Sequence, residues 1–133
     1  MTVFTEGEIA YLASQRLGRL ATAQPDGTLQ VSPVGFSYNE ALQTIDIAGR
    51  DMAASRKFRN VAANGRAAFV VDDIASLQPW VVRCLEIRGM AEAIAEPADS
   101  AARNASPIIR LQPRRIISWG IDPPEHARGT RNV

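Results

Sequence analysis

The sequence predicts a mainly β domain of the α+β class, in which six antiparallel strands form a small barrel and one helix lies between the third and fourth strands. Three observations favour this class. Most strand-like runs are joined by short turns, as in hairpins. Glycine and proline interrupt the longer runs, which suits strands that bend around a barrel. One segment, between the third and fourth runs, has the apolar spacing of a helix. The 133 residues are of ordinary length for one such domain.

A short amphipathic helix is predicted at the start of the chain. Thr5 and Glu8 have the spacing of a capping box, in which each side chain accepts a hydrogen bond from the other residue's amide. Ile9, Leu12 and Ala13 then form an apolar stripe. The sequence therefore predicts a helix that begins after Thr5 and has one apolar side.

A hairpin is predicted next. The Pro-Asp-Gly sequence at 25–27 presets a tight turn between strands at 18–24 and 28–38. Pro33 lies inside the second strand and has no amide hydrogen for the ladder, so we expect it at a bulge or a locally unpaired position. Gly35 suits a bulge or the close approach of a ligand to the backbone.

The third strand, residues 43–49, alternates isoleucine with polar residues and precedes the inserted helix. Ser55 can cap this helix, which is predicted to run to Asn64, and Gly65 suits the position after its last residue. Three apolar residues are spaced to face a core: Phe58, Val61 and Ala62. The polar residues expected on the other faces are Arg56, Arg59 and Asn60.

Two further strands are predicted after the inserted helix. Residues 66–73 form an apolar run typical of a strand buried on both sides, and residues 74–79 are expected to be a loop. Residues 80–96 alternate over most of their length, and Gly89 is the natural place for a bend.

The end of the chain carries weaker signals. Residues 97–107 are expected to be a loop or a short, poor helix. The last strand, at 108–121, is expected to be broken by Pro113. The polar tail, residues 122–133, is expected to be flexible.

Composition excludes several classes of function. Fifteen basic and fourteen acidic residues give a net charge of +1, so we expect no binding to nucleic acid or membrane. Cys84, the only cysteine, rules out an internal disulfide and alternates with apolar residues, which predicts a small core residue. No signal peptide is visible, and no apolar run approaches the ~20 residues that span a bilayer, so a cytoplasmic protein is expected.

No set of catalytic or metal-ligating side chains can be assembled from the sequence. His126, the only histidine, lies in the polar tail. Catalytic motifs such as GxSxG, HExxH and the Walker A loop are absent. We therefore predict no metal site and no catalytic side chain, and any redox chemistry has to come from a cofactor.

One segment could bind an anion. Residues 50–66 contain five bases and one acid. The free amides and the dipole at the start of the inserted helix favour an anion. Ser55 adds a hydroxyl, and Arg56 and Lys57 add full charges. The same residues also suit the solvated face of a surface helix, and from the residues alone both interpretations stay open.

Several segments together resemble one known family. They are "GRLATAQPDGTLQVSPVGF", "GRDMAASRKFRNVAANGRAAFVVDD" and "EIRGMAEAI". These resemble the opening hairpin, the phosphate-binding signature and the long fifth strand of the pyridoxamine-phosphate-oxidase-like split β-barrels, and the similarity extends to about Ile121. The segment from Ser32 to Asp73 and the closing "IIRLQPRRIISWGI" most resemble the actinobacterial group that uses the deazaflavin coenzyme F420. That group includes a reductase acting late in tetracycline biosynthesis.

The resemblance implies a six-stranded split barrel that forms a homodimer, with two cofactor sites in the clefts between protomers. The positions matching the family's phosphate-binding run are Ser55, Arg56 and Lys57, with Asn60 nearby. Those that would run along the cofactor's ring system are Pro33, Val34, Gly35 and Phe36, with Ala48 and Gly49 at the end of the third strand. Trp80 and Trp119 would approach from the partner subunit.

The function implied is an F420-dependent oxidoreductase, more specifically an F420H2-dependent reductase, that transfers a hydride between the reduced deazaflavin cofactor and an unsaturated organic acceptor. The alternatives are an FMN-binding oxidoreductase on the same barrel and an F420-binding or carrier protein without turnover. The chain lacks the Arg-x-His-type ending of pyridoxamine-phosphate oxidases, which argues against a vitamin B6 substrate. Tyr38 is a candidate proton donor, but solvent serves equally well, and we expect a solvated hydroxyl at the end of its strand.

Overall fold

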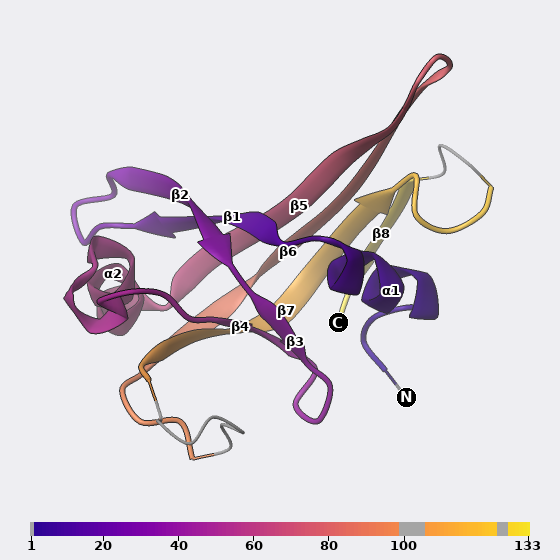
Figure 1. Ribbon diagram of the computed structural model, residues 1–133. Coiled ribbons are helices and arrows are strands. Elements are labelled where there is room, and N and C mark those ends of the chain that lie inside the picture. Colours follow the sequence, from indigo (N-terminus) through magenta and orange to yellow (C-terminus); the bar gives the residue numbers. More distant parts are fainter. Residues whose placement is uncertain (1, 99–105, 125–127) are drawn as a thin grey trace.

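The structure is a curled antiparallel sheet with helix α2 on one side and helix α1 on the other (Figure 1). This computed structural model describes residues 2–98, 106–124 and 128–133. The helices are α1 (Glu6–Ser14) and α2 (Arg56–Asn64), and a 3-10 turn, η1 (Met52–Ala54), precedes α2. The strands are β1 (Leu17–Ala23), β2 (Leu29–Gly35), β3 (Ser37–Asn39), β4 (Thr44–Ile47), β5 (Arg66–Leu77), β6 (Trp80–Ile94), β7 (Ile108–Trp119) and β8 (Arg128–Asn132).

The two ends of the sheet are consecutive pieces of one backbone segment. The strand order is β2-β1-β5-β6-β7-β4-β3, with β8 paired to β7. Only Phe36 separates the end of β2 from the start of β3. The sheet therefore curls until it returns to the strand on which it began, and it opens at Phe36. This is a barrel with a split, as expected.

The sequence predicts six strands, whereas the described residues form eight. The predicted strand at 28–38 is divided into β2 and β3, because the chain changes its pairing partner from β1 to β4 at Phe36. The tail, for which no element was predicted, contains β8, which pairs with β7 from Arg115 to Trp119. Its polar residues gave no strand signal, because the pairing depends on a neighbour distant in sequence.

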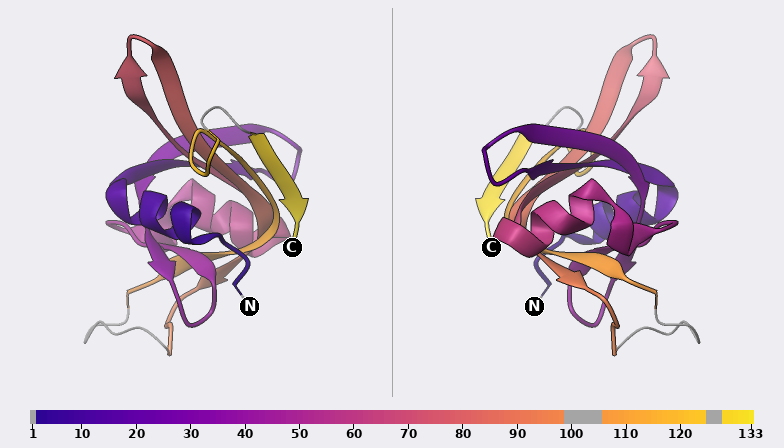
Figure 2. Two further views of the ribbon diagram at one scale, coloured as in Figure 1. Left: turned by 90° about the vertical axis from the view of Figure 1, so that its right-hand side faces the viewer. Right: turned by 90° about the vertical axis from the view of Figure 1, so that its left-hand side faces the viewer.

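The predicted loop at 74–79 is the tip of a long hairpin. β5 continues to Leu77 and pairs with β6, which begins at Trp80, so only Gln78 and Pro79 form the turn. This β5–β6 arm projects away from the rest of the sheet (Figure 2). The proline is tolerated because the turn needs no ladder donor. Exposed apolar side chains cover the tip: Ile74, Leu77 and Trp80.

Both strand prolines behave differently from the expectation. Pro33 pairs opposite Arg19 in a ladder without a bulge, because β2 has no partner on its other edge in the described chain. Pro113 does not break β7, since a register shift at this point leaves Arg114 as an extra residue. Gly89 pairs with Pro113 at this shift, and a Cβ on Gly89 would collide with the backbone carbonyl of Gln112. The predicted irregularity at Gly89 is confirmed.

The core lies inside the curl of the sheet. Ile45 and Ile47 of β4 are fully buried, as their alternation predicts. In β5 only Phe69 and Val71 are buried, whereas the residues between and beside them keep part of their surface, so this strand is covered on one face rather than two. Cys84 is a buried core residue, as expected.

Candidate functional site

The predicted ring-binding residues line the split of the barrel. The β1–β2 ladder ends at Gly35, opposite Leu17, and the β3–β4 ladder starts at Ser37, opposite Asp46. Phe36 lies between them and packs edge-on against Phe69, with 5.0 Å between ring centroids. Ala48 and Gly49 directly follow β4, and both are exposed. The structure thus brings the two predicted segments to the same opening.

One face of β2 is exposed along its whole length. Leu29, Val31, Pro33 and Gly35 are exposed, whereas the alternate residues are buried or half-buried. Val34 is buried in the core, so of the predicted ring contacts in β2 only Pro33 and Gly35 are exposed. The exposed residues of this face therefore extend along β2 as far as Gly35, where the split begins.

The backbone at the split is not covered by the chain itself. A Cβ placed on Gly35 would meet nothing within 4 Å, so packing does not require glycine there. A Cβ on Gly49 would lie 3.5 Å from the terminal methyl of Met52, an ordinary contact. Packing within the chain therefore does not explain why these two positions lack side chains, and their absence fits the approach of a flat ring to the backbone.

Helix α2 begins with two amides that have no acceptor. Ser55 is the predicted N-cap: its Oγ accepts from the amide of Phe58 at 3.2 Å and donates to the carbonyl of Met52 at 2.6 Å. The amide of Arg59 donates to the carbonyl of Ser55. The amides of Arg56 and Lys57 donate to no group in the described chain. Helix geometry leaves these donors free, and the helix dipole adds positive potential around them.

Two cationic side chains stand at this helix start. Lys57 is half-buried and Arg56 is exposed, and within the described ranges neither forms an ion pair. Arg56 also influences Asp26 in the β1–β2 turn. The pKa of Asp26 is lowered mainly by hydrogen bonds from Thr28, and the positive charge of Arg56 lowers it further. Gly65 ends the helix in the left-handed conformation, with φ 70°, as predicted.

Asn60 does not lie on a solvated face as expected. It is 1% exposed, and its amide donates to Thr22 Oγ1 at 3.1 Å and Gln30 Oε1 at 3.5 Å. It therefore fastens α2 to the β1–β2 hairpin beneath the helix start. Val61 is buried as predicted, but Ala62 is exposed, because the helix presents the face carrying Asn60 to the sheet.

Comparison with known proteins adds the family. Residues 5–119 match the family model described as pyridoxamine 5'-phosphate oxidase. The chain belongs to the pyridoxamine 5'-phosphate oxidase family. A 5a,11a-dehydrotetracycline/5a,11a-dehydrooxytetracycline reductase from Streptomyces rimosus subsp. rimosus is 49% identical over 122 residues, which cover 90% of this chain and 84% of the relative. This member of the family is therefore similar to an oxidoreductase over almost its full length.

Solved structures share the fold. An F420 reductase is 25% identical, with a TM-score of 0.61, over 83% of this chain and 95% of that one. A pyridoxamine 5'-phosphate oxidase-related, FMN-binding protein from Nostoc punctiforme is 12% identical, with a TM-score of 0.63, over 96% of this chain and 95% of that one. The split barrel of this family thus occurs in proteins named for F420 and for FMN.

The two tryptophans lie away from the split of this family member. Trp80 is 60% exposed at the tip of the β5–β6 arm. Trp119 is half-buried at the end of β7, with the Arg128 guanidinium carbon 5.9 Å from the centre of its ring. The residues of β7 that pair with β4 are at the opposite end of the strand, from Ile109 to Leu111. Neither tryptophan therefore lies at the split within this chain.

Sequence reasoning was wrong about Tyr38 of β3. Its hydroxyl is not solvated but buried, and it has no hydrogen-bond partner in the described part of the chain. The residue follows Phe36 by two positions and shares its inward direction, a signal that was available in the alternation. The N-terminal segment that covers it, including Phe4 at 5.4 Å between ring centroids, could not be placed from the sequence.

The described residues contain no group of three or more His, Cys, Asp or Glu residues arranged to hold a metal ion. They also contain no helix long and apolar enough to cross a membrane.

Proposed function

We propose that the protein is an F420-dependent reductase, which takes a hydride from the reduced deazaflavin and adds it to a conjugated carbon–carbon double bond of an organic acceptor. One observation carries the proposal: free amides and unpaired cations at the start of α2 occur in the same chain as an uncovered backbone at the split. A phosphate and a flat ring are both present in such a cofactor. The reductase from Streptomyces rimosus and the F420 reductase structure support the choice of reaction and cofactor.

The cofactor phosphate belongs at the start of α2. The amides of Arg56 and Lys57 can both donate to it, and the side chains of these residues supply two positive charges. The hydroxyl of Ser55 already caps the helix, so its main role is to keep the amides pointing outward. Asn60 supports this arrangement from below, through its bond to Thr22.

The ring system belongs along the split. Pro33, Gly35 and Phe36 would lie on one side of it, and Ala48 and Gly49 on the other. Because β2 is an edge strand in the described chain, its backbone groups on the unpaired side remain available for the polar edge of a ring.

Reduced F420, when bound, supplies the hydride. The task of the chain is to hold the acceptor with its reactive carbon about 3–3.5 Å from the donor carbon and to exclude water from the contact. The acceptor gains the hydride at one carbon and a proton at its neighbour, and solvent can supply that proton. The double bond of the acceptor would thereby become a single bond, with the two electrons supplied by the hydride.

We further propose that the site is completed by a second copy of the chain. The face of β2 that leads into the split is apolar and open, with Leu29 80% and Val31 67% exposed. Leu17 of the neighbouring strand adds to this patch. A homodimer through this face would bury the patch and cover the ring. The two tryptophans would then belong to the partner's side of the site.

Two other functions use the same features. FMN also carries a phosphate and a flat ring, and the FMN-binding protein from Nostoc punctiforme has this fold. A carrier of F420 without turnover would need the same binding surface. Comparing the affinities for F420 and FMN tests the first alternative, an FMN-binding protein. Oxidation of reduced F420 by an enone in the presence of the protein would exclude the second alternative, a carrier without turnover.

The phosphate assignment is tested by Lys57→Ala, with Arg59→Ala as the matched control on the same helix. Loss of one charge-assisted contact is expected to cost about 1.5–3 kcal/mol, or roughly a tenfold to a hundredfold loss of F420 affinity. Arg59→Ala removes the same charge from an exposed site and should change the affinity less than about twofold. Equal affinities of the two variants, measured by fluorescence titration, would refute the assignment.

A further inference from the structure

The projecting β5–β6 arm has one apolar side (Figure 2). Three large apolar side chains are exposed near its tip: Ile74, Leu77 and Trp80. No residue from Ile74 to Val82 is charged. Ile74 pairs with Val82 and Leu77 pairs with Trp80, and residues paired across antiparallel strands share a side. Because Val82 and Trp80 are two residues apart, both pairs lie on the same side of the arm.

Helix α1 supports the opposite side of the arm. Asp73 and Arg83 pair across the base of the arm, and their side chains form an ion pair. Tyr11 of α1 donates a hydrogen bond to Asp73 at 2.9 Å, and the Arg83 guanidinium carbon lies 5.0 Å from the centre of the Tyr11 ring. These contacts fix the direction of the arm. A contact surface that is already oriented loses less conformational entropy on binding than a flexible loop does.

The apolar side of the arm continues into the exposed face of β2. Val70 lies four residues before Ile74 on the same side of β5. It pairs with Arg19 of β1, which pairs in turn with Pro33 of β2. The arm and the exposed face of β2 are therefore on one side of the sheet. The exposed apolar residues of this side outside the arm are Leu17, Leu29 and Val31.

The size and charge of this side suit a second copy of the chain. Its six exposed apolar side chains provide on the order of 700 Å² of surface, near the ~800 Å² that each partner buries in a stable interface of standard size. Charged residues of this side form two ion pairs within the chain, Arg19 with Asp72 and Arg88 with Glu86. Nucleic acids and anionic membranes attract unpaired cations, whereas paired charges and apolar surface are typical of contacts between proteins.

The arm has the length of the face that it would cover. Extending the β1–β5 register places Leu17, at the split, level with Asp72 of β5. From Asp72 the arm continues for six residues to Gln78, about 20 Å at 3.3 Å per residue. In the opposite direction, β1 also continues for six residues, from Leu17 to Ala23, beside β2. A two-fold axis across the strands at the level of the split therefore places the arm of each copy along this face of the other.

We propose that two copies of the chain pair about such an axis, that the arm of each copy packs on the exposed face of β2 in the other, and that it closes the split over the cofactor ring. Leu77 and Trp80 of the partner would then cover Leu29 and Val31, and the partner's Ile74 would lie over Pro33, where the ring is proposed. The site of each protomer is thus incomplete without the partner's arm, which excludes water from it. This inference rests on the proposed reductase function and names the element of the partner that completes its site.

The first test measures dimerisation without cofactor, by analytical ultracentrifugation. Leu77→Ser combined with Trp80→Ser removes the apolar tip and is expected to raise the dimer Kd at least about tenfold, as loss of a buried interface tryptophan does. Leu42→Ser is the matched control, because Leu42 is also an exposed apolar residue, in the turn between β3 and β4, and its loss should leave the dimer Kd unchanged. A monomeric wild type, or the same Kd in the tip variant as in the wild type, would overturn the proposal.

The second test asks whether the arm acts on the partner's site. One copy carries Lys57→Ala, the other carries the two tip substitutions, and two different affinity tags isolate the mixed dimer. Each parent variant is expected to bind F420 at least about tenfold more weakly than the wild type. If the arm reaches across, one site of the mixed dimer has both defects and the other has neither, so half of the sites should bind F420 with wild-type affinity in a fluorescence titration. If the arm acts on its own chain, every site has one defect and no tight site appears.

The two tests separate this inference from the proposed function. If the wild type binds F420 but the mixed dimer has no tight site, the contact across the dimer is refuted while the reductase function stands. If the tip substitutions weaken the dimer of a protein that does not bind F420, the arm interface stands and the proposed function fails.

Discussion

Two glycines of the sheet, Gly35 and Gly89, have opposite surroundings. A Cβ on Gly35 would meet nothing within 4 Å, whereas one on Gly89 would collide with the carbonyl of Gln112. Gly35→Ala should therefore leave the melting temperature unchanged but weaken F420 binding. The added methyl would occupy space proposed for the cofactor ring, and the binding free energy should become less favourable by about 1–3 kcal/mol, as in overpacked cores. Gly89→Ala should lower the free energy of unfolding. Thermal unfolding and F420 titration of both variants check this, and a Gly35→Ala variant with full affinity would contradict it.

Cys84 should be chemically inert in the folded protein. Burial raises the pKa of its thiol to about 11, and the nearby charges of Asp72 and Glu86 act in the same direction. Since only the thiolate is alkylated, the reaction at about pH 8 should be roughly a hundredfold slower than in the unfolded chain. Iodoacetamide labelling followed by mass spectrometry, with and without urea, measures this. The same rate in both conditions would show that the thiol is accessible.

At the residue scale, the sequence predicted what depends on near neighbours. The capping box of Thr5 and Glu8, the Ser55 cap and the left-handed Gly65 are confirmed, because each needs only residues within one or two turns. Asn60 and Tyr38 were misjudged. Their burial is decided by the hairpin under α2 and by the N-terminal segment, which no local pattern reveals.

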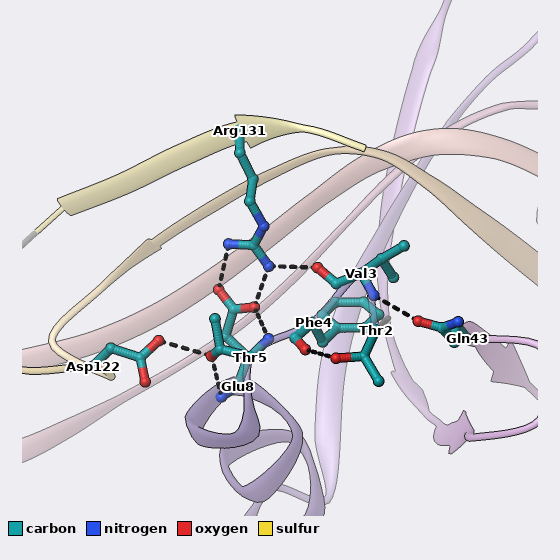
Figure 3. A network of polar contacts seen from close by, with 8 residues as sticks. All are labelled: Thr2, Val3, Phe4, Thr5, Glu8, Gln43, Asp122 and Arg131. Atoms are coloured by element: carbon teal, nitrogen blue, oxygen red, sulfur yellow. Dashed lines mark hydrogen bonds and ion pairs between the residues drawn. The ribbon is translucent and has the colours of Figure 1, made fainter.

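At the element scale, β8 holds the N-terminal helix in place. Figure 3 shows Arg131 of β8 bridging the carboxylate of Glu8 and the carbonyl of Val3. The Glu8 carboxylate also accepts from the Thr5 amide at 2.9 Å, and its side chain is 0% exposed. The capping box therefore serves both the helix and the contact with the end of the chain.

Removing the cation of this pair should destabilise the fold. Arg131→Ala leaves a buried carboxylate without its counter-charge, which is expected to lower the free energy of unfolding by about 3 kcal/mol. Arg128→Ala, on the same strand but exposed, is the matched control and should cost less than about 1 kcal/mol. Urea denaturation compares the two, and equal midpoints would contradict a stabilising role for β8.

Elements were predictable where pairing follows sequence order. The β1–β2 hairpin was predicted because its turn and both strands are contiguous. The tip of the β5–β6 arm was predicted as a loop. The last residues of β5, including Ile74 and Leu77, are mostly exposed, so their sequence lacks the alternation of buried apolar and exposed polar residues that predicts a strand. β8 was missed because the segment has no β pattern of its own, and its pairing with β7 cannot be read from the local sequence.

At the scale of the whole molecule, the exposed apolar face of β2 predicts a dimer. Light scattering during gel filtration should give twice the 14.4 kDa mass of one chain. Val31→Glu places a charge on this face and should shift the protein to monomer and weaken F420 binding together. Ala10→Glu, on the exposed side of α1, should do neither. A Val31→Glu dimer with full affinity would locate the interface, and the completed site, elsewhere.

The central claim is that this barrel binds and uses F420. The most direct measurement is titration of the wild-type protein with F420 and with FMN, followed by addition of 5a,11a-dehydrotetracycline or 2-cyclohexen-1-one to the protein loaded with reduced F420. The account predicts tighter binding of F420 than of FMN, and oxidation of the reduced cofactor only when protein and acceptor are both present. Binding of FMN alone, or F420 binding without turnover of any enone, would contradict it.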